Sequence, residues 1–232
     1  MYHRTAVRAR LPLLLLAATA GCAPPERPVG APVISAIALR DRVPGYQQVS
    51  SREFTLAYLE KTYDRVEYIT QALDEPTGTA RAAFTTALQA QLEASAFVDV
   101  YLLTLGENYL PWFAGIDPSL RAKLRLIYNT GGGGARQAPG WLALGARTYV
   151  AHPGPNSWSP LFYLEFLPAW TRGVRLEEAV SAANQKTKAR LTTGASHWAL
   201  ELTGALDDDA DGPAVWAMTQ AETYGDPTLT LR

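Results

Sequence analysis

Four short apolar runs, separated by stretches with helical periodicity, constrain the fold of this chain more than any other feature. They occupy residues 33–39, 97–105, 124–128 and 147–151, and β-branched and aromatic side chains recur in them. A strand that is apolar on both sides must be covered on both faces, which is typical of parallel sheets flanked by helices. The pattern predicts an α/β fold, a three-layer αβα sandwich with a mostly parallel sheet.

Between these runs, apolar residues recur every three or four positions, as they do on one face of a helix. The first such stretch follows a capping-box pattern at residues 50–53 and extends to Leu73, so it predicts one long helix. Residues 84–92, the segment that begins at Ser159, and residues 176–183 predict three further helices. A final strand is expected after the acidic segment at residues 207–211.

The amino-terminal segment predicts export and lipid attachment. Basic residues precede a ten-residue apolar run at 11–20, which is too short to span a bilayer. Residues 19–22 (Thr-Ala-Gly-Cys) resemble the lipobox of bacterial lipoproteins, although Thr19 stands where that family usually has Leu. The resemblance implies a signal peptide at residues 1–21 and palmitate on the thiol of Cys22. The alternative is an ordinary signal peptide with an incidental cysteine.

Residues 22–32 are rich in proline and predict an extended tether, after which a single domain covers residues 33–232. An acylated Cys22 would anchor this domain in a bacterial cell envelope. Ala23 follows the cysteine, and by analogy with known lipoproteins the lack of Asp there favours the outer membrane, facing the periplasm.

Composition narrows the function classes. The chain has 21 Lys and Arg against 22 Asp and Glu, so no charge excess favours nucleic acid or acidic lipid as a partner. With 47% hydrophobic residues, its 232 residues can bury the core of one domain. One cysteine and three histidines exclude a disulfide framework and nearly exclude a Cys/His zinc site, so we expect no cofactor of that kind.

Two predicted strand ends are the places where chemistry would occur, since sites in parallel sheets form outside the carboxyl ends of the strands. One reads Leu103-Thr104-Leu105-Gly106, and the other continues from Tyr128-Asn129-Thr130 into glycines 131–134. Further motifs follow in order: Gly145-Ala146-Arg147, Ser157-Trp158-Ser159-Pro160, Trp170-Thr171-Arg172-Gly173, Glu178-Ala179-Val180 with Ala183-Asn184, and Tyr224-Gly225-Asp226-Pro227. Together they resemble the caspase-like cysteine peptidases, the group of legumains and gingipains.

The resemblance implies a caspase-like sheet whose catalytic His and Cys would follow the second and third of these strands. Leu105 stands at the His position, and Gly132 aligns best with the Cys position. A thiolate and a base are both required for this chemistry, so the resemblance implies a degenerate domain without catalytic residues. It predicts a pseudoenzyme that acts as a membrane-anchored binding or scaffold protein for an envelope protein or peptide.

Two alternatives remain open at this point. The first is an active envelope hydrolase with a relocated site around His152 and Ser157, although no nucleophile-elbow spacing supports it. The second is a structural lipoprotein whose fold is only a spacer. Trp112 follows the degenerate strand end closely and is either core cover or part of an exposed aromatic platform for a ligand.

Two loops have partial binding signatures. Glycines 131–134 lack the Lys-Ser/Thr ending of a phosphate loop, so flexible filling of a vacated site is the better interpretation. Asp207, Asp209 and Asp211, followed by Gly212, have the spacing that opens a calcium-binding EF-hand loop, but Met218 occupies the position of the bidentate Glu. The segment is therefore either a solvated acidic loop or a weak Ca²⁺ site.

Overall fold

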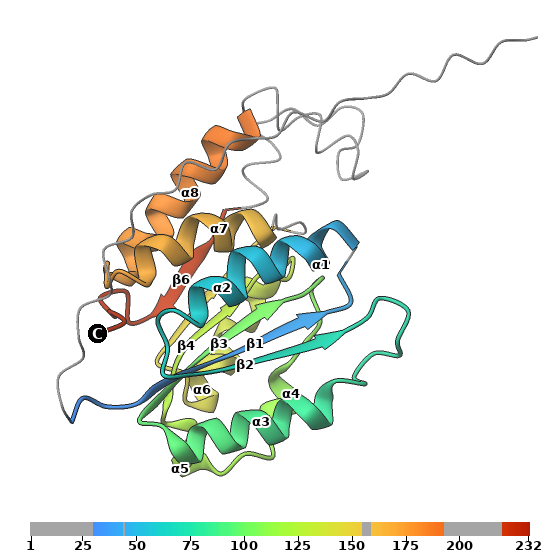
Figure 1. Cartoon of the computed structure of the whole chain (residues 1–232), viewed down its shortest axis with the longest axis vertical. Coiled ribbons are helices and arrows are strands. Elements are labelled where there is room, and N and C mark those ends of the chain that lie inside the picture. The colour runs from blue at the N-terminus through green and yellow to red at the C-terminus, as the bar shows by residue number, and fades with distance from the viewer. Residues whose placement is uncertain (1–29, 44, 155–158, 193–219) are drawn as a thin grey trace, which may run out of the picture.

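The computed structural model describes residues 30–43, 45–154, 159–192 and 220–232. Its centre is a six-stranded sheet in the order β2-β1-β3-β4-β5-β6 (Figure 1). The first five strands form four parallel pairs, β2–β1, β1–β3, β3–β4 and β4–β5, and β6 is antiparallel to β5. The predicted α/β class and mostly parallel sheet are confirmed. The strands are β1 (Ile34–Asp41), β2 (Arg65–Gln71), β3 (Phe97–Leu103), β4 (Leu124–Asn129), β5 (Thr148–Ala151) and β6 (Glu222–Gly225).

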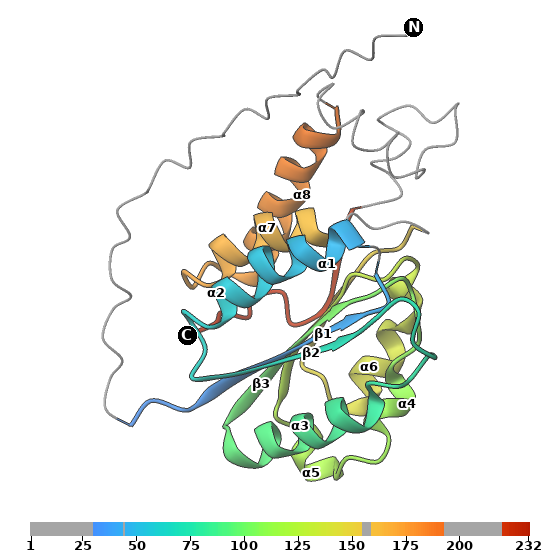
Figure 2. The ribbon, with the colours of Figure 1, turned by 45° about the vertical axis from the view of Figure 1, so that its right-hand side comes forward.

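Helices cover both faces of the sheet, so the layers form a sandwich (Figure 2). One layer contains α1 (Gly45–Ser51), the π-helix η1 (Arg52–Leu56), α2 (Ala57–Leu59), α7 (Ser159–Trp170) and α8 (Leu176–Thr192). The other contains α3 (Arg81–Ala94), α4 (Leu110–Phe113), α5 (Pro118–Arg121), the 3₁₀-helix η2 (Gly134–Gln137) and α6 (Ala138–Leu144). No described helix is long and apolar enough to cross a membrane.

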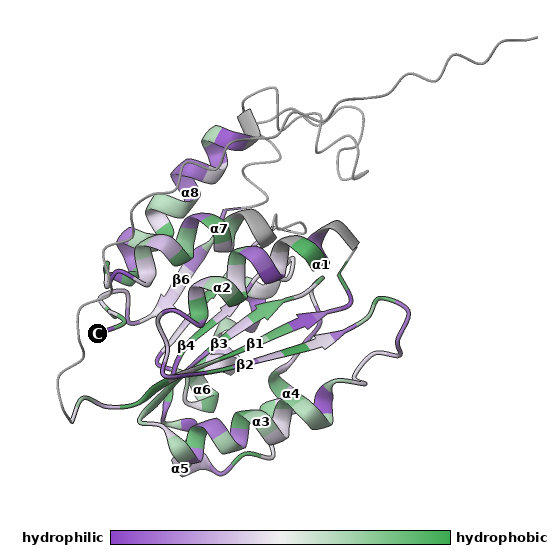
Figure 3. Cartoon of the chain, viewed as in Figure 1, coloured by the Kyte–Doolittle hydropathy of each residue, from purple (hydrophilic) through white to green (hydrophobic). Residues whose placement is uncertain are grey.

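The core consists of two clusters, one on each face of the sheet. Alternate residues of each strand point to opposite faces, so Tyr101 belongs to the cluster under α7 and α8, and Val100 to the cluster over α3 and α6. Large aromatic side chains fill both clusters, among them Trp170 in the first and Trp141 in the second. Figure 3 shows hydrophobic residues along the central strands, whereas much of α8 consists of hydrophilic residues.

The prediction of one long helix that reaches Leu73 is wrong. The helical segment ends at Leu59, and the chain returns as β2 along the edge of the sheet. In β2 the residues alternate: Val66 and Tyr68 pack against one core cluster and Ile69 against the other. This two-residue period and the β-branched side chains favour a strand, and pairing with β1 satisfies one edge of its backbone.

The final strand is β6, which follows the acidic segment. Residues 222–225 form β6, whereas residues 226–232 contain no strand. They run along the edge of the sheet where the parallel strands begin, and carbonyls of Pro227 and Leu229 accept bonds from the first N–H groups of α8, those of Glu177 (3.0 Å) and Leu176 (2.8 Å). Capping a helix start in this way removes unsatisfied donors, so these carbonyls bond a helix rather than a sheet.

Candidate functional site at the carboxyl edge of the sheet

The loops after β3 and β4 meet at the edge where the parallel strands end, here called the carboxyl edge. A Cβ atom on Gly131 would lie 2.7 Å from Thr104 Oγ1 and 2.8 Å from Gly106 Cα. A Cβ atom on Gly106, where φ is +121°, would lie 2.9 Å from the carbonyl oxygen of Gly132. Glycine alone fits such an approach of two backbones. The structure therefore confirms that Leu105 and Gly132 lie at adjacent strand ends.

The glycine run is a hydrogen-bonded turn. The side-chain oxygen of Asn129 accepts from Gly131 N (2.9 Å) and from the hydroxyl of Thr104 (3.3 Å). Its amide donates to the hydroxyl of Tyr149 (3.0 Å), which in turn donates to the carbonyl of Gly134 (2.9 Å). One buried asparagine thus connects both strand ends and gives the turn defined bonding partners, while the flexibility of the glycine run stays a prediction.

Leu105 presents an apolar side chain at this edge. It is 51% exposed, one of four large hydrophobic residues that are exposed among the described residues. The next two residues in the loop, Gly106 and Glu107, are half-buried, and Asn108 is exposed. A leucine is normally buried, and here it projects from a strand end whose backbone is fixed by close contact with the neighbouring loop.

His152 lies beneath the carboxyl edge and is fully buried. Its ring stacks on Tyr128, with centroids 6.0 Å apart, and meets the ring of Phe162 edge-on at 4.5 Å. Its carbonyl accepts from Ala135 N (3.2 Å), which joins the end of β5 to the glycine turn. Ser157, its partner in the hydrolase hypothesis, lies outside the described residues.

Trp112 is part of the core. It is 8% exposed and packs edge-on against Phe84 (5.8 Å between centroids) and Tyr109 (4.9 Å). Together with Phe113, which is fully buried, it closes the α3 side of the sheet. This burial agrees with the interpretation of Trp112 as core cover, and the suggested exposed aromatic platform is wrong.

One buried carboxylate, that of Asp41 at the end of β1, is not predicted from the sequence. Asp41 has no exposed surface, accepts a hydrogen bond from the hydroxyl of Tyr109, and has one oxygen, Oδ1, without a hydrogen-bond partner among the described residues. Burial raises the pKa of Asp41, the Tyr109 bond lowers it, and the charge of Glu107 raises it further, with a net rise. In the sequence Arg40-Asp41-Arg42 this residue has the pattern of a solvated charge cluster.

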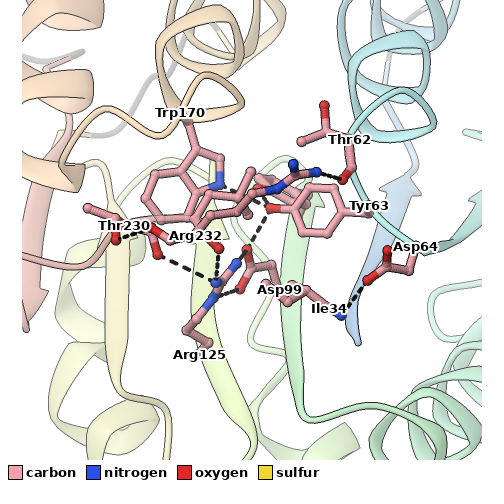
Figure 4. Close-up of polar contacts among 11 residues, drawn as sticks. Ile34, Thr62, Tyr63, Asp64, Asp99, Arg125, Trp170, Thr230 and Arg232 are labelled. Atoms are coloured by element: carbon pink, nitrogen blue, oxygen red, sulfur yellow. Dashed lines mark hydrogen bonds and ion pairs between the residues drawn. The ribbon is translucent and has the colours of Figure 1, made fainter. Parts of the chain in front are cut away.

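A second buried polar cluster lies at the opposite edge, where the parallel strands begin, here called the amino edge (Figure 4). Arg125 binds Asp99 through two bonds, Nε to Oδ1 (2.9 Å) and Nη2 to Oδ2 (2.5 Å). The hydroxyl of Tyr63 donates to Asp99 (2.5 Å) and accepts from Trp170 Nε1 (3.0 Å). Burial lowers the pKa of Arg125, but the charge and hydrogen bonds of Asp99, together with the nearby hydroxyls of Tyr63 and Tyr101, outweigh this effect, and the pKa is raised.

The metal and lipid predictions concern other parts of the chain. Within the described ranges, no group of three or more His, Cys, Asp or Glu residues could hold a metal ion. The candidate Ca²⁺ ligands Asp207, Asp209 and Asp211 lie outside these ranges, as does Cys22. The Ca²⁺ loop and the lipid attachment therefore stay predictions.

The candidate site is thus a junction of two strand-end loops with an exposed leucine, and a buried histidine and a buried carboxylate lie at the ends of β5 and β1 along the same edge. No protein-family model, curated protein or solved structure matches this chain.

Proposed function

We propose that this chain is a lipid-anchored, catalytically degenerate caspase-like domain that acts as a binding or scaffold protein in the bacterial cell envelope. The adjacency of the loops after β3 and β4 supports this, because the catalytic residues of that family would have to meet at such a junction. Leu105 cannot carry a proton and Gly132 has no side chain, so these positions supply neither base nor nucleophile.

The exposure of Leu105 carries the proposal. An aliphatic side chain that is 51% exposed on a fixed backbone loses little conformational entropy on binding and gains by burial in a partner. The neighbouring glycine turn lets a partner approach the backbone closely. These features suit an envelope protein or peptide with an apolar side chain that covers Leu105.

A photo-cross-linking amino acid at position 105 tests this directly. In intact envelopes we expect one discrete cross-linked product from that position, and none from position 142. Leu142 is the matched control, since it is 36% exposed on α6, outside the strand-end junction. The same product from both positions, or none from position 105, would refute a binding site at Leu105.

A peptidase assay separates binding from hydrolysis. We expect the purified mature chain to leave a broad peptide library uncut. Cleavage that survives purification to homogeneity and disappears in the Ser157→Ala variant would instead establish the hydrolase with a site around His152.

The anchor has its own test. Labelled palmitate should enter the full chain in cells and should not enter a Cys22→Ser variant. Equal labelling of both would refute lipid attachment at Cys22 and, with it, the proposed place at the outer membrane facing the periplasm.

A further inference from the structure

A groove runs along the amino edge of the sheet, at the end of the molecule opposite to Leu105. It consists of two adjoining pockets of about 250 and 320 Å³. Both are lined by Pro32, Ile34, Leu231 and Arg232, so they form one continuous depression between the start of β1 and the last described residues. Phe97 extends the apolar lining at the start of β3.

Two arginines on the rim of this groove retain capacity for a further anion. The Arg147 side chain is 57% exposed, and its Nε lies 3.9 Å from Asp226, beyond hydrogen-bond distance. Arg232 is exposed and donates one bond, from Nη2 to the carbonyl of Thr62 (3.0 Å; Figure 4). A guanidinium has five N–H donors, so neither group is saturated by these contacts.

The acidic groups of the groove are already engaged by other residues. Asp226 accepts from Thr228 twice, from N (2.9 Å) and from Oγ1 (2.7 Å), and these bonds lower the pKa of its carboxyl. Asp64 accepts from Ile34 N (2.7 Å; Figure 4). Although the whole chain has no charge excess, the groove combines an apolar lining with two arginines whose N–H donors are not all bonded, one of which, Arg147, faces Asp226.

The position of the groove relative to the predicted anchor favours a membrane ligand. Ala31 and Pro32 line it immediately before β1 begins. Only eight residues along the chain separate Gly30 from Cys22, so the two cannot be more than about 29 Å apart. The eight residues of β1 separate the amino edge from the carboxyl edge by about 26 Å. An anchor at Cys22 would thus keep the start of β1 within about 29 Å of the bilayer, whereas the carboxyl edge can lie farther from it.

We propose that this groove docks the headgroup of an anionic phospholipid, with Arg147 and Arg232 binding the phosphate and the apolar lining facing the glycerol and acyl portion. The inference rests on the proposed membrane attachment for its orientation. Contact at this edge turns the junction at Leu105 away from the bilayer, where it is accessible to a partner.

The test uses the unlipidated mature chain with Cys22→Ser, so that the anchor contributes nothing to membrane binding. We expect it to co-float with vesicles of phosphatidylcholine and phosphatidylglycerol at low salt, and not with phosphatidylcholine alone. The double variant Arg147→Gln/Arg232→Gln should lose about thirtyfold in partitioning, since each basic side chain at an anionic surface strengthens binding about fivefold. Raising the salt should weaken binding of the parent chain.

A charge-matched control is the double variant Arg52→Gln/Arg81→Gln, which removes the same charge from η1 and from the start of α3. It should keep most of the binding. An equal loss of binding in both double variants would overturn the groove in favour of diffuse charge. Equal binding of the parent chain to neutral and to anionic vesicles, or no binding to either, would overturn the anionic phospholipid as the ligand. Palmitate labelling of the full chain reads out the anchor separately, so failure of the groove and failure of the anchor are distinguishable.

Discussion

The buried ion pair between Asp99 and Arg125 should be the most sensitive point of the fold to a single isosteric substitution. Asp99 has no exposed surface and Arg125 has 4%, and two hydrogen bonds of 2.9 and 2.5 Å join them. Asp99→Asn keeps the shape and removes the charge, which leaves a buried guanidinium without a counter-ion. Breaking a buried pair in this way costs about 3–5 kcal/mol, a large share of the roughly 5–15 kcal/mol that stabilises a domain.

The reciprocal substitution locates the origin of that cost. Arg125→Met removes the cation and its bond to the Leu231 carbonyl (2.6 Å), but Tyr63 still donates to the remaining carboxylate. Asp99→Asn with Arg125→Met buries no unpaired charge. We therefore expect the double variant to lose at least about 2 kcal/mol less than the sum of the two single losses, as is found for residues in direct contact.

Urea unfolding, followed by far-ultraviolet circular dichroism and by tryptophan fluorescence, measures these free energies. Trp170, one of six tryptophans in the chain, contributes to the fluorescence, and its ring lies 5.6 Å from the Arg125 guanidinium. The control is Arg175→Met, which breaks an ion pair with Glu177 (3.1 Å) whose two side chains are each 47% exposed, and which should change stability by less than about 0.5 kcal/mol. A loss below about 1 kcal/mol for Asp99→Asn, or simple additivity in the double variant, would refute this reasoning.

Three further substitutions have defined outcomes in the same unfolding assay. The pKa of Asp41 is raised above its ordinary value of 3.8, so above that pH the folded state binds more protons than the unfolded state. The free energy of unfolding should therefore fall as pH rises through this range, and Asp41→Asn should remove this pH dependence. Gly131→Ala should cost about 1–3 kcal/mol through the clash with Thr104 and Gly106, whereas Gly115→Ala, with nothing within 4 Å, should be nearly neutral. Tyr63→Phe should cost about 1–3 kcal/mol through its lost hydroxyl bonds, and a loss no larger than that of Tyr58→Phe would contradict the described network.

The sequence predicts the sheet because its central strands are covered on both faces. Residues 97–103 and 124–129 are apolar almost throughout, which only a buried strand allows at that length. The edge strand β2 is different, since most of its residues are exposed or half-buried and its apolar positions also fit a helical spacing. The sequence favours a helical period there because Leu56, Leu59 and Tyr63 precede it on one helical face, and the turn at Thr62 has no glycine or proline to mark it.

The adjacency of Leu105 and Gly132 is predictable for a topological reason. Neighbouring parallel strands end at the same edge, so residues just after each strand meet without any knowledge of side-chain packing. The pairing of Asp99 with Arg125 does not follow from local pattern, since 26 positions separate them and each interrupts an apolar run as a single polar residue. The register of β3 against β4, which brings them together, shifts between Val98 and Asp99 and is visible only in three dimensions.

The two edges of the sheet are built by different physical means, and this separates the proposed roles. At the carboxyl edge, backbones meet at glycines and one buried asparagine bonds both loops, which fixes Leu105 without burying it. At the amino edge, a buried charge pair holds residues 230–231 against the strands, so the groove walls depend on Arg125. Because six positions along the chain, about 20 Å when extended, separate Asp99 from Leu105, the two sites share β3 and no direct contact. Substitutions that remove lipid binding at the groove rim should therefore leave the cross-linked product from position 105 intact in detergent-solubilised envelopes, where the partner is still present and the bilayer no longer orients the domain.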